Sequence, residues 1–411
     1  MQKITKYLDL LIYWLIVLIP LSIAVAPAAV HTFMGFLTFF FLLKKILKKE
    51  RLFISTPVNL PFLFLVFVAI LSFRNSVDYS SSFRGIGKLI QYAFLFLICA
   101  EEIKDKKHIT RIFLSMISGA MLVSVDALWQ IATGRDFVRG NELKTAIGLI
   151  RATASFPNPN ILGIYLTAIT PLIIGMTLFY YKGRAKLFLF FVSSLASIGV
   201  FLTLSRGAGL GLFLGILFLS FVRKNRTITF ILIAILLVYP FVMPRNIKSW
   251  ARQVNYNPVV FMLNPDRISM YRNALNMIEH HPLIGVGVNT FCKNYLYYKL
   301  PEPDDARTAD HIYAHNNFLH MAGDIGLLGL AVFIWLLFNL FRQATRIYRK
   351  MADGYYKVVS LSITACLIAF LINGLTETSL YYARVAMIFW YLVGFSLSLN
   401  KFLPRDERAK N

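Results

Sequence analysis

The sequence contains little charge, and acidic residues are especially few. Asp, Glu, Lys and Arg make up 15% of its 411 residues and apolar residues 57%, whereas soluble domains have about 25% charged and about 45–50% apolar residues. This excludes a soluble globular protein, because the folded chain could not cover its apolar side chains with polar surface. The composition predicts a polytopic membrane protein.

Cysteine is scarce as well, and no cleavable leader is expected. Cys99, Cys292 and Cys366 lie far apart, two of them in apolar stretches, so no disulfide framework is expected. Lys3 and Lys6 precede an apolar run of full spanning length with no small-residue cleavage pattern after it. We therefore expect this first run to be a transmembrane helix.

Long apolar segments recur along the whole chain. A helix needs about 20 apolar residues to cross about 30 Å of hydrocarbon, and this criterion predicts an all-α fold with about twelve transmembrane helices. Around 187–222, Ser205-Arg206-Gly207 indicates either a tight hairpin or a break within one long bent segment. The predicted spans are 8–26, 28–43, 57–73, 86–100, 112–132, 159–181, 187–204, 207–222, 227–243, 317–341, 358–374 and 382–400.

Basic residues are distributed unevenly between the two sides. With the N-terminus in the cytoplasm, 26 of the 43 Lys and Arg residues fall in inner segments, and 8 of the other 17 lie in one long outer loop. The positive-inside rule then places both termini in the cytoplasm. The net charge of +23 would suggest nucleic acid in a soluble chain, but here it is mostly a topology signal, and we expect membrane lipids and no nucleic acid as partners. The predicted parts are spans one to nine (1–243), an outer helical loop (244–316), spans ten to twelve (317–400) and a cytoplasmic tail (401–411).

The long outer loop contains most of the residues that could carry chemistry. Five of the seven histidines lie between 280 and 320. Asn264-Pro265-Asp266 predicts a helix start, and His281-Pro282 predicts its end. In the following span, Gly323, Gly326 and Gly329 lie three apart, a spacing that lets a neighbouring helix approach closely.

Four ordered segments between about 150 and 330 resemble the bacterial superfamily of O-antigen ligases and O-antigen polymerases. Asp324 stands where that family usually carries Glu. The segments are His315-Asn316-Asn317-Phe318-Leu319 with Gly326 and Gly329, Arg267…Tyr271…Ala274…Pro282-Leu283-Ile284-Gly285-Val286-Gly287, Arg151 to Asn160, and Ser205-Arg206-Gly207.

The resemblance implies a GT-C-like glycosyltransferase of the bacterial inner membrane. Such an enzyme moves a glycan from undecaprenyl pyrophosphate to an acceptor hydroxyl on the periplasmic face. For a ligase, the donor is undecaprenyl-pyrophosphate-linked O-polysaccharide and the acceptor is a sugar of lipid A–core. The acceptor hydroxyl needs a base, and the pyrophosphate needs positive charge as its bond breaks.

The sequence contains candidates for both tasks. His315, just before the tenth span, is the candidate general base, although an interfacial polar residue would fit the same position. Arg206 and Arg267 are candidates for binding the pyrophosphate, with Arg151 as the third choice, because guanidinium forks match phosphate oxygens. Snorkelling to the headgroups would also explain Arg206, and an ion pair with Asp266 or Glu279 would explain Arg267.

Four further residues are candidates for supporting roles. Asn316 belongs to the His315 motif, and His311 would lie one turn before His315 if the helix extends that far. His320 and Asp324 are four apart on one helix face, so Asp324 could orient His320 or hold a proton, unless the two are a buried polar pair between spans.

We expect no metal and no cofactor. Four acidic residues lie in a Pro-flanked stretch that is typical of a solvated loop, and the 311/315 histidine spacing has no third strong ligand. The stretch holds Glu302, Asp304, Asp305 and Asp310.

The transfer motif does not identify the acceptor. An O-antigen polymerase or a protein O-oligosaccharyltransferase would use the same chemistry, and the sequence leaves the sugar, glycan length and oligomeric state open. A twelve-span transporter or flippase is a more distant alternative, against which stands the lack of an internal repeat between the two halves.

Overall fold

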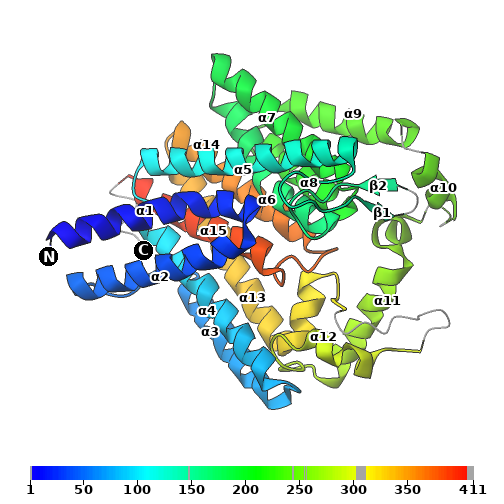
Figure 1. Ribbon diagram of the computed structural model, residues 1–411, viewed down its shortest axis with the longest axis horizontal. Helices are drawn as coiled ribbons and strands as arrows, with labels where there is room; N and C mark the ends of the chain where they lie inside the picture. The colour runs from blue at the N-terminus through cyan, green and yellow to red at the C-terminus, as the bar shows by residue number, and fades with distance from the viewer. Residues whose placement is uncertain are drawn as a thin grey trace.

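The computed structural model describes residues 2–146, 149–242, 245–253, 255, 257–301 and 312–404. Almost all of its regular structure is helical, and each predicted span coincides with a helix, which confirms the all-α polytopic class (Figure 1). These helices are α1 (Gln2–Val25), α2 (Pro27–Lys48), α3 (Asn59–Leu71), α4 (Tyr79–Glu102), α5 (Lys106–Thr133), α6 (Pro159–Phe179), α7 (Gly183–Leu202), α8 (Arg206–Val222), α9 (Arg226–Val242), α13 (Asn317–Lys350), α14 (Tyr355–Asn373) and α15 (Ala383–Ser398).

Helix length separates these twelve into two groups. Within the described residues, nine helices are long and apolar enough to cross a membrane, whereas α3, α8 and α9 are shorter apolar helices. The count of twelve spans therefore stays a prediction. Conversely, α13 continues well beyond the predicted end at 341, to 34 residues or about 51 Å, because hydropathy detects only the apolar part of a helix that continues through good helix formers.

The ambiguous region 187–222 forms two helices. α7 ends at Leu202 and α8 begins at Arg206, and both pack against α6. Leu204 has a φ of +49°, a conformation that a continuous helix cannot contain. The Ser205 side chain caps α8 by accepting from the backbone N–H of Ala208. The polar tripeptide is therefore a helix end followed by a new helix start.

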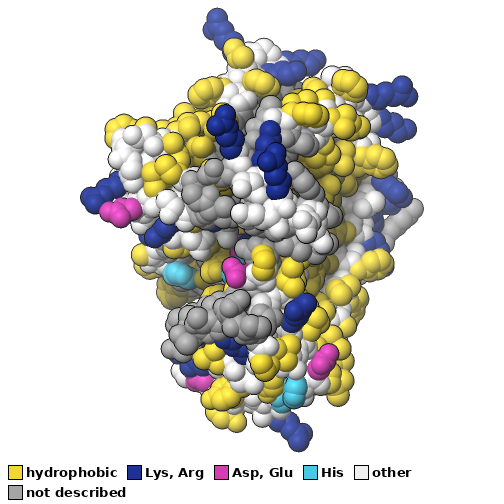
Figure 2. All heavy atoms as spheres, turned by 90° about the vertical axis from the view of Figure 1, so that its right-hand side faces the viewer, with side chains coloured by type: hydrophobic (Ala, Val, Ile, Leu, Met, Phe, Trp, Pro, Cys, Tyr) yellow, Lys and Arg dark blue, Asp and Glu magenta, His cyan; other side chains and the backbone are white. Residues whose placement is uncertain are grey.

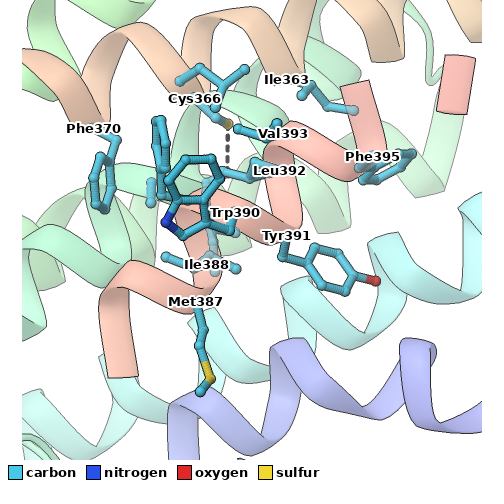
Figure 3. Packing of buried hydrophobic residues seen from close by; sticks show 14 of the residues in the cluster. Ile363, Cys366, Phe370, Met387, Ile388, Trp390, Tyr391, Leu392, Val393 and Phe395 are labelled. Carbon is cyan, nitrogen blue, oxygen red and sulfur yellow. Dashed lines mark hydrogen bonds between the residues drawn. The ribbon is translucent and has the colours of Figure 1, made fainter. Parts of the chain in front are cut away.

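The centre of the bundle is formed by α6, α14 and α15. Most residues of α6 and α15 are buried, and Figure 3 shows the side chains of α14 and α15 packed together, including Phe370, Trp390 and Tyr391. The Phe370 ring stacks on Phe389 with centroids 5.0 Å apart, and the Tyr391 hydroxyl donates to the carbonyl of Ile16 in α1 (2.9 Å). This rigid centre carries the connection between α14 and α15.

The connections predicted to be cytoplasmic gather at one end of the bundle, and those predicted to be periplasmic gather at the other. At the first end, buried Lys44 pairs with Asp9 (2.5 Å) and Glu102 (2.6 Å). At the second end, the Ser155 hydroxyl donates to the carbonyl of Ala24 (2.6 Å), which joins the connection before α6 to the last turn of α1.

The second end contains additional short elements. Between α5 and α6, β1 (Lys144–Ala146) pairs antiparallel with β2 (Leu149–Arg151). Between α9 and α13 lie α10 (Arg245–Gln253), α11 (Pro258–His280), α12 (Phe291–Asn294) and the 3-10 helix η2 (Tyr295–Tyr298). The predicted end of the loop helix is confirmed, but its predicted start at 264–266 is wrong. α11 begins at Pro258, since proline fits the first turn of a helix as well there as at Pro265.

Candidate active site

α13 is interrupted after its first eight residues. Ile325 and Gly326 have non-helical backbone angles, and the segment that follows α11, residues 282–291, lies in this interruption. We call this segment the inserted loop. Its backbone replaces hydrogen bonds that the helix gives up there, so the loop and α13 form one unit. The bonds are Val286 N to Gly323 O (2.9 Å), Gly287 N to Asp324 O (2.9 Å) and Leu327 N to Pro282 O (2.8 Å).

Glycine is required at the interruption. Gly326 has a φ of +73° and a ψ of 177°, and a Cβ atom there would lie 2.0 Å from the carbonyl oxygen of Leu283. Gly323 faces the ring of Phe291 at similarly close range. The close neighbour of these glycines is therefore the inserted loop, whereas their spacing suggested another helix.

Asp324 holds the inserted loop. Its Oδ2 accepts from the backbone N–H of Asn289 (2.9 Å), and its Oδ1 accepts from that of Phe291 (2.8 Å). His320 Nε2 lies 3.9 Å from Oδ2, beyond hydrogen-bonding distance. The i,i+4 spacing predicted a pair, but the carboxylate is used by backbone donors of a segment that only the tertiary structure brings near.

His320 supports the backbone that leads to His315. Its ring is buried between Phe291 (4.2 Å between centroids) and Tyr381 (3.9 Å), and its Nδ1 accepts from the backbone N–H of Ala314 (3.4 Å). This side chain therefore serves as packing and as an anchor for residues 313–315.

His315 lies directly before the cap of α13. Asn316 is the N-cap, and its side chain accepts from the backbone N–H groups of Phe318 and Leu319. His315 has a φ of +46°, which is unusual for a residue other than glycine. The Tyr271 hydroxyl contacts the carbonyl oxygens of both His315 (3.1 Å) and Leu375 (2.7 Å). This conformation is thus held from α11 and from the connection between α14 and α15.

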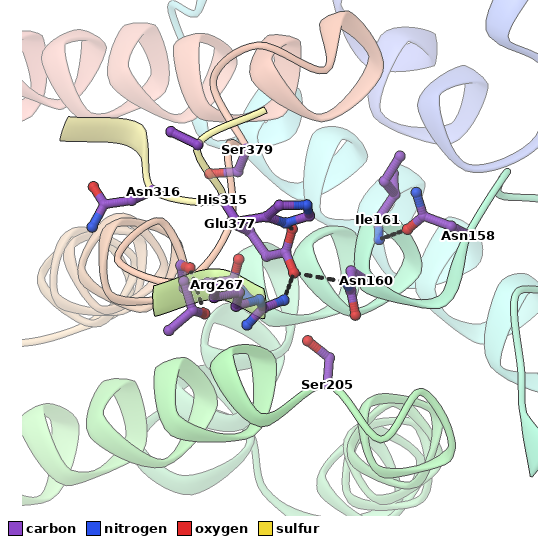
Figure 4. Close-up of polar contacts among 12 residues, drawn as sticks. Asn158, Asn160, Ile161, Ser205, Arg267, His315, Asn316, Glu377 and Ser379 are labelled. Carbon is purple, nitrogen blue, oxygen red and sulfur yellow. Dashed lines mark hydrogen bonds and ion pairs between the residues drawn. The ribbon is translucent and has the colours of Figure 1, made fainter. Parts of the chain in front are cut away.

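The side chain of His315 pairs with Glu377, a residue that the sequence reasoning missed. His315 Nδ1 lies 3.0 Å from Glu377 Oε2. The other oxygen, Oε1, accepts from Asn160 Nδ2 (2.6 Å) and from Arg267 (Figure 4). The Glu377 side chain is only 1% exposed. One buried carboxylate therefore joins residues from α6, α11 and the segment before α13.

Glu377 is ionised in this setting. Burial by itself raises the pKa of its carboxyl, but the charge of Arg267, the hydrogen bond from His315 and the charge of Arg151 outweigh burial and leave the pKa below its ordinary value. One signal could have found it: Glu377 is the only acidic residue between Asp353 and Asp406, in a short connection between two apolar spans.

Two of the three candidate arginines surround this carboxylate. Arg267 comes from α11, pairs with Glu377 and keeps 15% of its side chain exposed. Arg151 Nε donates to the carbonyl of Thr203 (2.7 Å), and its terminal nitrogen donates to Asn160 Oδ1 (2.6 Å). Arg151 therefore reaches Glu377 through Asn160, and it also ties the β-hairpin to the turn before α8.

Arg206 is the first residue of α8, at the same end of the bundle. The next residue, Gly207, lies so close to Thr376 that a Cβ atom would be 1.9 Å from its hydroxyl oxygen. The start of α8 therefore touches the residue that precedes Glu377 in the chain. Among the remaining candidates, His311 lies outside the described residues. Because α13 begins at Asn317, the helical spacing between His311 and His315 does not apply.

The site has the charge expected of an anion-binding surface. Arg267 and Arg151 lie around the Glu377 carboxylate, and Arg206 begins α8 beside Thr376 at the same end of the bundle. Basic side chains are more frequent than acidic ones on the face that carries α9, α10 and α11 (Figure 2). Among the described residues, no group of three or more His, Cys, Asp or Glu side chains could hold a metal ion. The acidic stretch that includes Glu302 and Asp310 lies outside them.

Comparison with known proteins agrees with the motifs. Residues 188–334 match the family described as O-antigen ligase, and the matched region contains Arg206, Arg267 and His315. Arg151 and Glu377 lie outside it. No curated protein matches the chain. The family implies glycosyl transfer of the ligase or polymerase type, with lipid-linked polysaccharide substrates and a lipid acceptor, and the apolar helices imply a multi-pass membrane protein. Over residues 188–334 the chain is therefore similar to the O-antigen ligase family.

Proposed function

We propose that the protein is an O-antigen ligase of the bacterial inner membrane. It moves O-antigen glycan from undecaprenyl pyrophosphate to a sugar hydroxyl of lipid A–core, at a site on the periplasmic face. The single observation that carries this proposal is the meeting of His315 and Arg267 on the Glu377 carboxylate. It brings a candidate base and a candidate phosphate ligand together at one end of the bundle.

His315 acts as the general base in this proposal. A sugar hydroxyl is a poor nucleophile until a base begins to remove its proton, and imidazole suits that task near neutral pH. The side chain of His315 is 25% exposed, so a substrate hydroxyl can reach it. The attack is a single displacement, which inverts the anomeric centre and converts an α-linked donor into a β product.

The arginines bind the leaving group. A lipid pyrophosphate carries about two to three negative charges, which must be stabilised as the glycosidic bond breaks, and arginine forks match its oxygens without losing charge at any working pH. Arg206 and Arg267 contact the pyrophosphate, while Arg151 holds Asn160 and adds positive charge to the surroundings. The residues described supply this charge themselves, so the reaction is proposed to be independent of a metal ion.

The acceptor is what distinguishes a ligase from the other enzymes that use the same transfer chemistry. A second lipid-linked repeat unit would make the protein a polymerase, and a Ser or Thr side chain would make it a protein O-oligosaccharyltransferase. A transporter or flippase would need a polar route to both faces. The ion-paired groups around Glu377 belong to the connections at one end of the bundle instead.

A transfer assay tests the proposal directly. Purified full-length protein in detergent is given lipid-linked O-polysaccharide and one of three acceptors: lipid A–core, a second lipid-linked unit or a Ser-containing peptide. We expect glycosylated lipid A–core with inverted anomeric configuration, without added nucleotide and in the presence of EDTA. His315→Ala should lower the rate at least 100-fold, whereas His280→Ala at the exposed end of α11 should not.

Each other outcome has a defined meaning. Transfer only to the second lipid-linked unit or to the peptide would assign the protein to one of the alternative branches. A product with retained configuration would refute the single displacement. Absence of transfer to every acceptor, together with movement of the lipid-linked glycan across liposomes, would refute the enzyme and favour a flippase.

A further inference from the structure

We infer that Glu377 is the positioning residue of His315 and that, through the same carboxylate, it sets the base and the phosphate ligand Arg267 in one fixed arrangement. This inference rests on the proposed function and adds to it a residue outside the region matched by the family. The geometry that carries it is a single buried side chain with one oxygen on His315 and the other on Arg267.

The pairing decides which nitrogen of His315 faces the acceptor. An ionised carboxylate only accepts hydrogen bonds, so Nδ1, which lies 3.0 Å from Glu377 Oε2, carries the hydrogen. Nε2 then has the free electron pair. The Tyr271 contact holds the backbone of His315 from the other side, so the ring has both its position and its tautomer determined before substrate arrives.

The pairing also stabilises the product of proton transfer. As the acceptor oxygen forms its bond to the anomeric carbon, its proton passes to Nε2, and the electron pair of the breaking bond stays on the pyrophosphate oxygen. The imidazolium that forms lies beside an ionised carboxylate from which water is largely excluded, where the attraction is stronger than in solution. His315 later releases this proton to solvent or to the phosphate product.

The second oxygen of Glu377, Oε1, keeps the phosphate ligand Arg267 at a fixed distance from the base His315. Oε1 accepts from Arg267 on α11 and from Asn160 on α6. Arg267 has five N–H donors, so it can keep its bond to Glu377 and still bind a phosphate oxygen. A shift of α11 would therefore change the distance between leaving group and base, and Glu377 resists such a shift.

The surroundings of His315 leave this role to Glu377. Among the described residues, the charged and titratable side chains whose interaction with His315, its backbone or its Glu377 partner is established are Glu377, Arg267, Arg151, Tyr271 and His320. Of these only Glu377 is an acid. The two arginines oppose a positive charge on the ring, and the Tyr271 hydroxyl stays neutral because burial raises its pKa to about 12.

Glu377→Gln tests the inference with little change of shape. We expect kcat to fall about 100-fold or more, since aligning and stabilising a base contributes on this scale. The KM for the lipid-linked donor should stay the same or fall, because the positive charge of Arg267 is no longer balanced. The matched control is Glu142→Gln, which removes an exposed carboxylate paired with Arg135 (2.8 Å) and should leave both constants unchanged.

A variant that keeps the charge separates positioning from a merely structural role. Glu377→Asp, which keeps the carboxylate on a shorter side chain, should restore part of kcat, whereas Glu377→Gln should not. If Glu377 only stabilised the fold, the kcat of the two variants would follow their unfolding temperatures and not the presence of the charge.

A double-mutant cycle distinguishes this inference from the proposed function. If Glu377 acts through His315, adding Glu377→Gln to His315→Ala lowers kcat no further. Additive losses, or a kcat of Glu377→Asp no higher than that of Glu377→Gln, would overturn the inference while His315 remained the base. Full activity of the single variant His315→Ala would overturn the proposed function itself. Circular dichroism and gel filtration of each variant show that it is folded.

Discussion

Replacing Gly326 by alanine is the sharpest test of how α13 and the inserted loop are joined. The substitution adds one methyl group at the point where the loop backbone enters the interrupted helix. The new Cβ would lie 2.0 Å from the carbonyl oxygen of Leu283 and 2.3 Å from its carbonyl carbon. Both are backbone atoms, so no side-chain rotation can make room.

The cost has two parts. The φ of +73° and ψ of 177° at Gly326 lie in a region populated almost only by glycine, and a residue with a Cβ loses about 1–3 kcal/mol there. Forcing packed backbone apart costs typically about 1–3 kcal/mol more. The sum, about 2–6 kcal/mol, is a large share of the 5–15 kcal/mol that ordinarily separates folded from unfolded protein.

Thermal unfolding in detergent measures this loss. At about 2 °C per kcal/mol for a large chain, Gly326→Ala should unfold about 4–12 °C below the wild type. Transfer activity should fall as well, because the same helix start positions His315. Gly35→Ala in α2 is the matched control: nothing lies within 4 Å of its new methyl group, and alanine is favoured within a helix by about 0.5–1 kcal/mol.

An unfolding temperature within about 1 °C of the wild type, with full activity, would refute the reasoning. It would mean that the interruption tolerates a side chain and that the loop is not held between the two parts of α13. A fall shared equally by Gly35→Ala would point to a general sensitivity of the helices to alanine and would equally remove the specific explanation.

Four further outcomes follow from the site. Arg267→Lys should lower kcat/KM for the lipid-linked donor about 10-fold or more, because a lysine cannot bridge Glu377 and a phosphate oxygen with a fixed fork. Asp324→Asn should lower the unfolding temperature by the equivalent of about 1–3 kcal/mol, since the amide nitrogen that replaces one carboxylate oxygen cannot accept from the backbone N–H of the inserted loop that this oxygen bound. Tyr271→Phe should lower kcat several-fold with little change in KM, as the backbone of His315 loses a donor. Because the folded pKa of Glu377 is depressed, its stabilisation is complete above the unfolded value of about 4.3 and is lost as pH falls through the folded value. The difference in unfolding temperature between wild type and Glu377→Gln should therefore shrink below about pH 4.

The positions of the membrane helices could be predicted because a long apolar segment is itself the signal for a spanning helix. Each predicted span coincides with a helix. The sequence left Ser205-Arg206-Gly207 open between a hairpin and a break in one bent segment, and the structure places a helix start there, with Ser205 as its cap. Errors appeared where the pattern was no longer apolar. The polar extension of α13 beyond 341 was missed for this reason. The start of α11 was missed because Pro258 fits a first helical turn as well as Pro265 does.

For the candidate site as well, residues in local motifs could be predicted and residues that depend on distant partners could not. His315 and Arg267 could be chosen from motifs, and the structure brings them to the same carboxylate. Glu377 carried only a weak signal, as a lone acid between two spans. Asp324 was paired with His320 on spacing, whereas its oxygens bind the inserted loop. Helical spacing describes neighbours on one helix and cannot reveal a segment that arrives from elsewhere.

The sequence by itself determined that this is an all-α membrane protein, where its helices lie and which segments resemble the O-antigen ligase superfamily. These properties depend on composition and on residues close together in the chain. Tertiary structure alone decided that Glu377 receives His315 from 62 residues away, Arg267 from 110 and Asn160 from 217. A buried carboxylate is stabilised only by the partners that folding brings to it, so its role is absent from any local pattern.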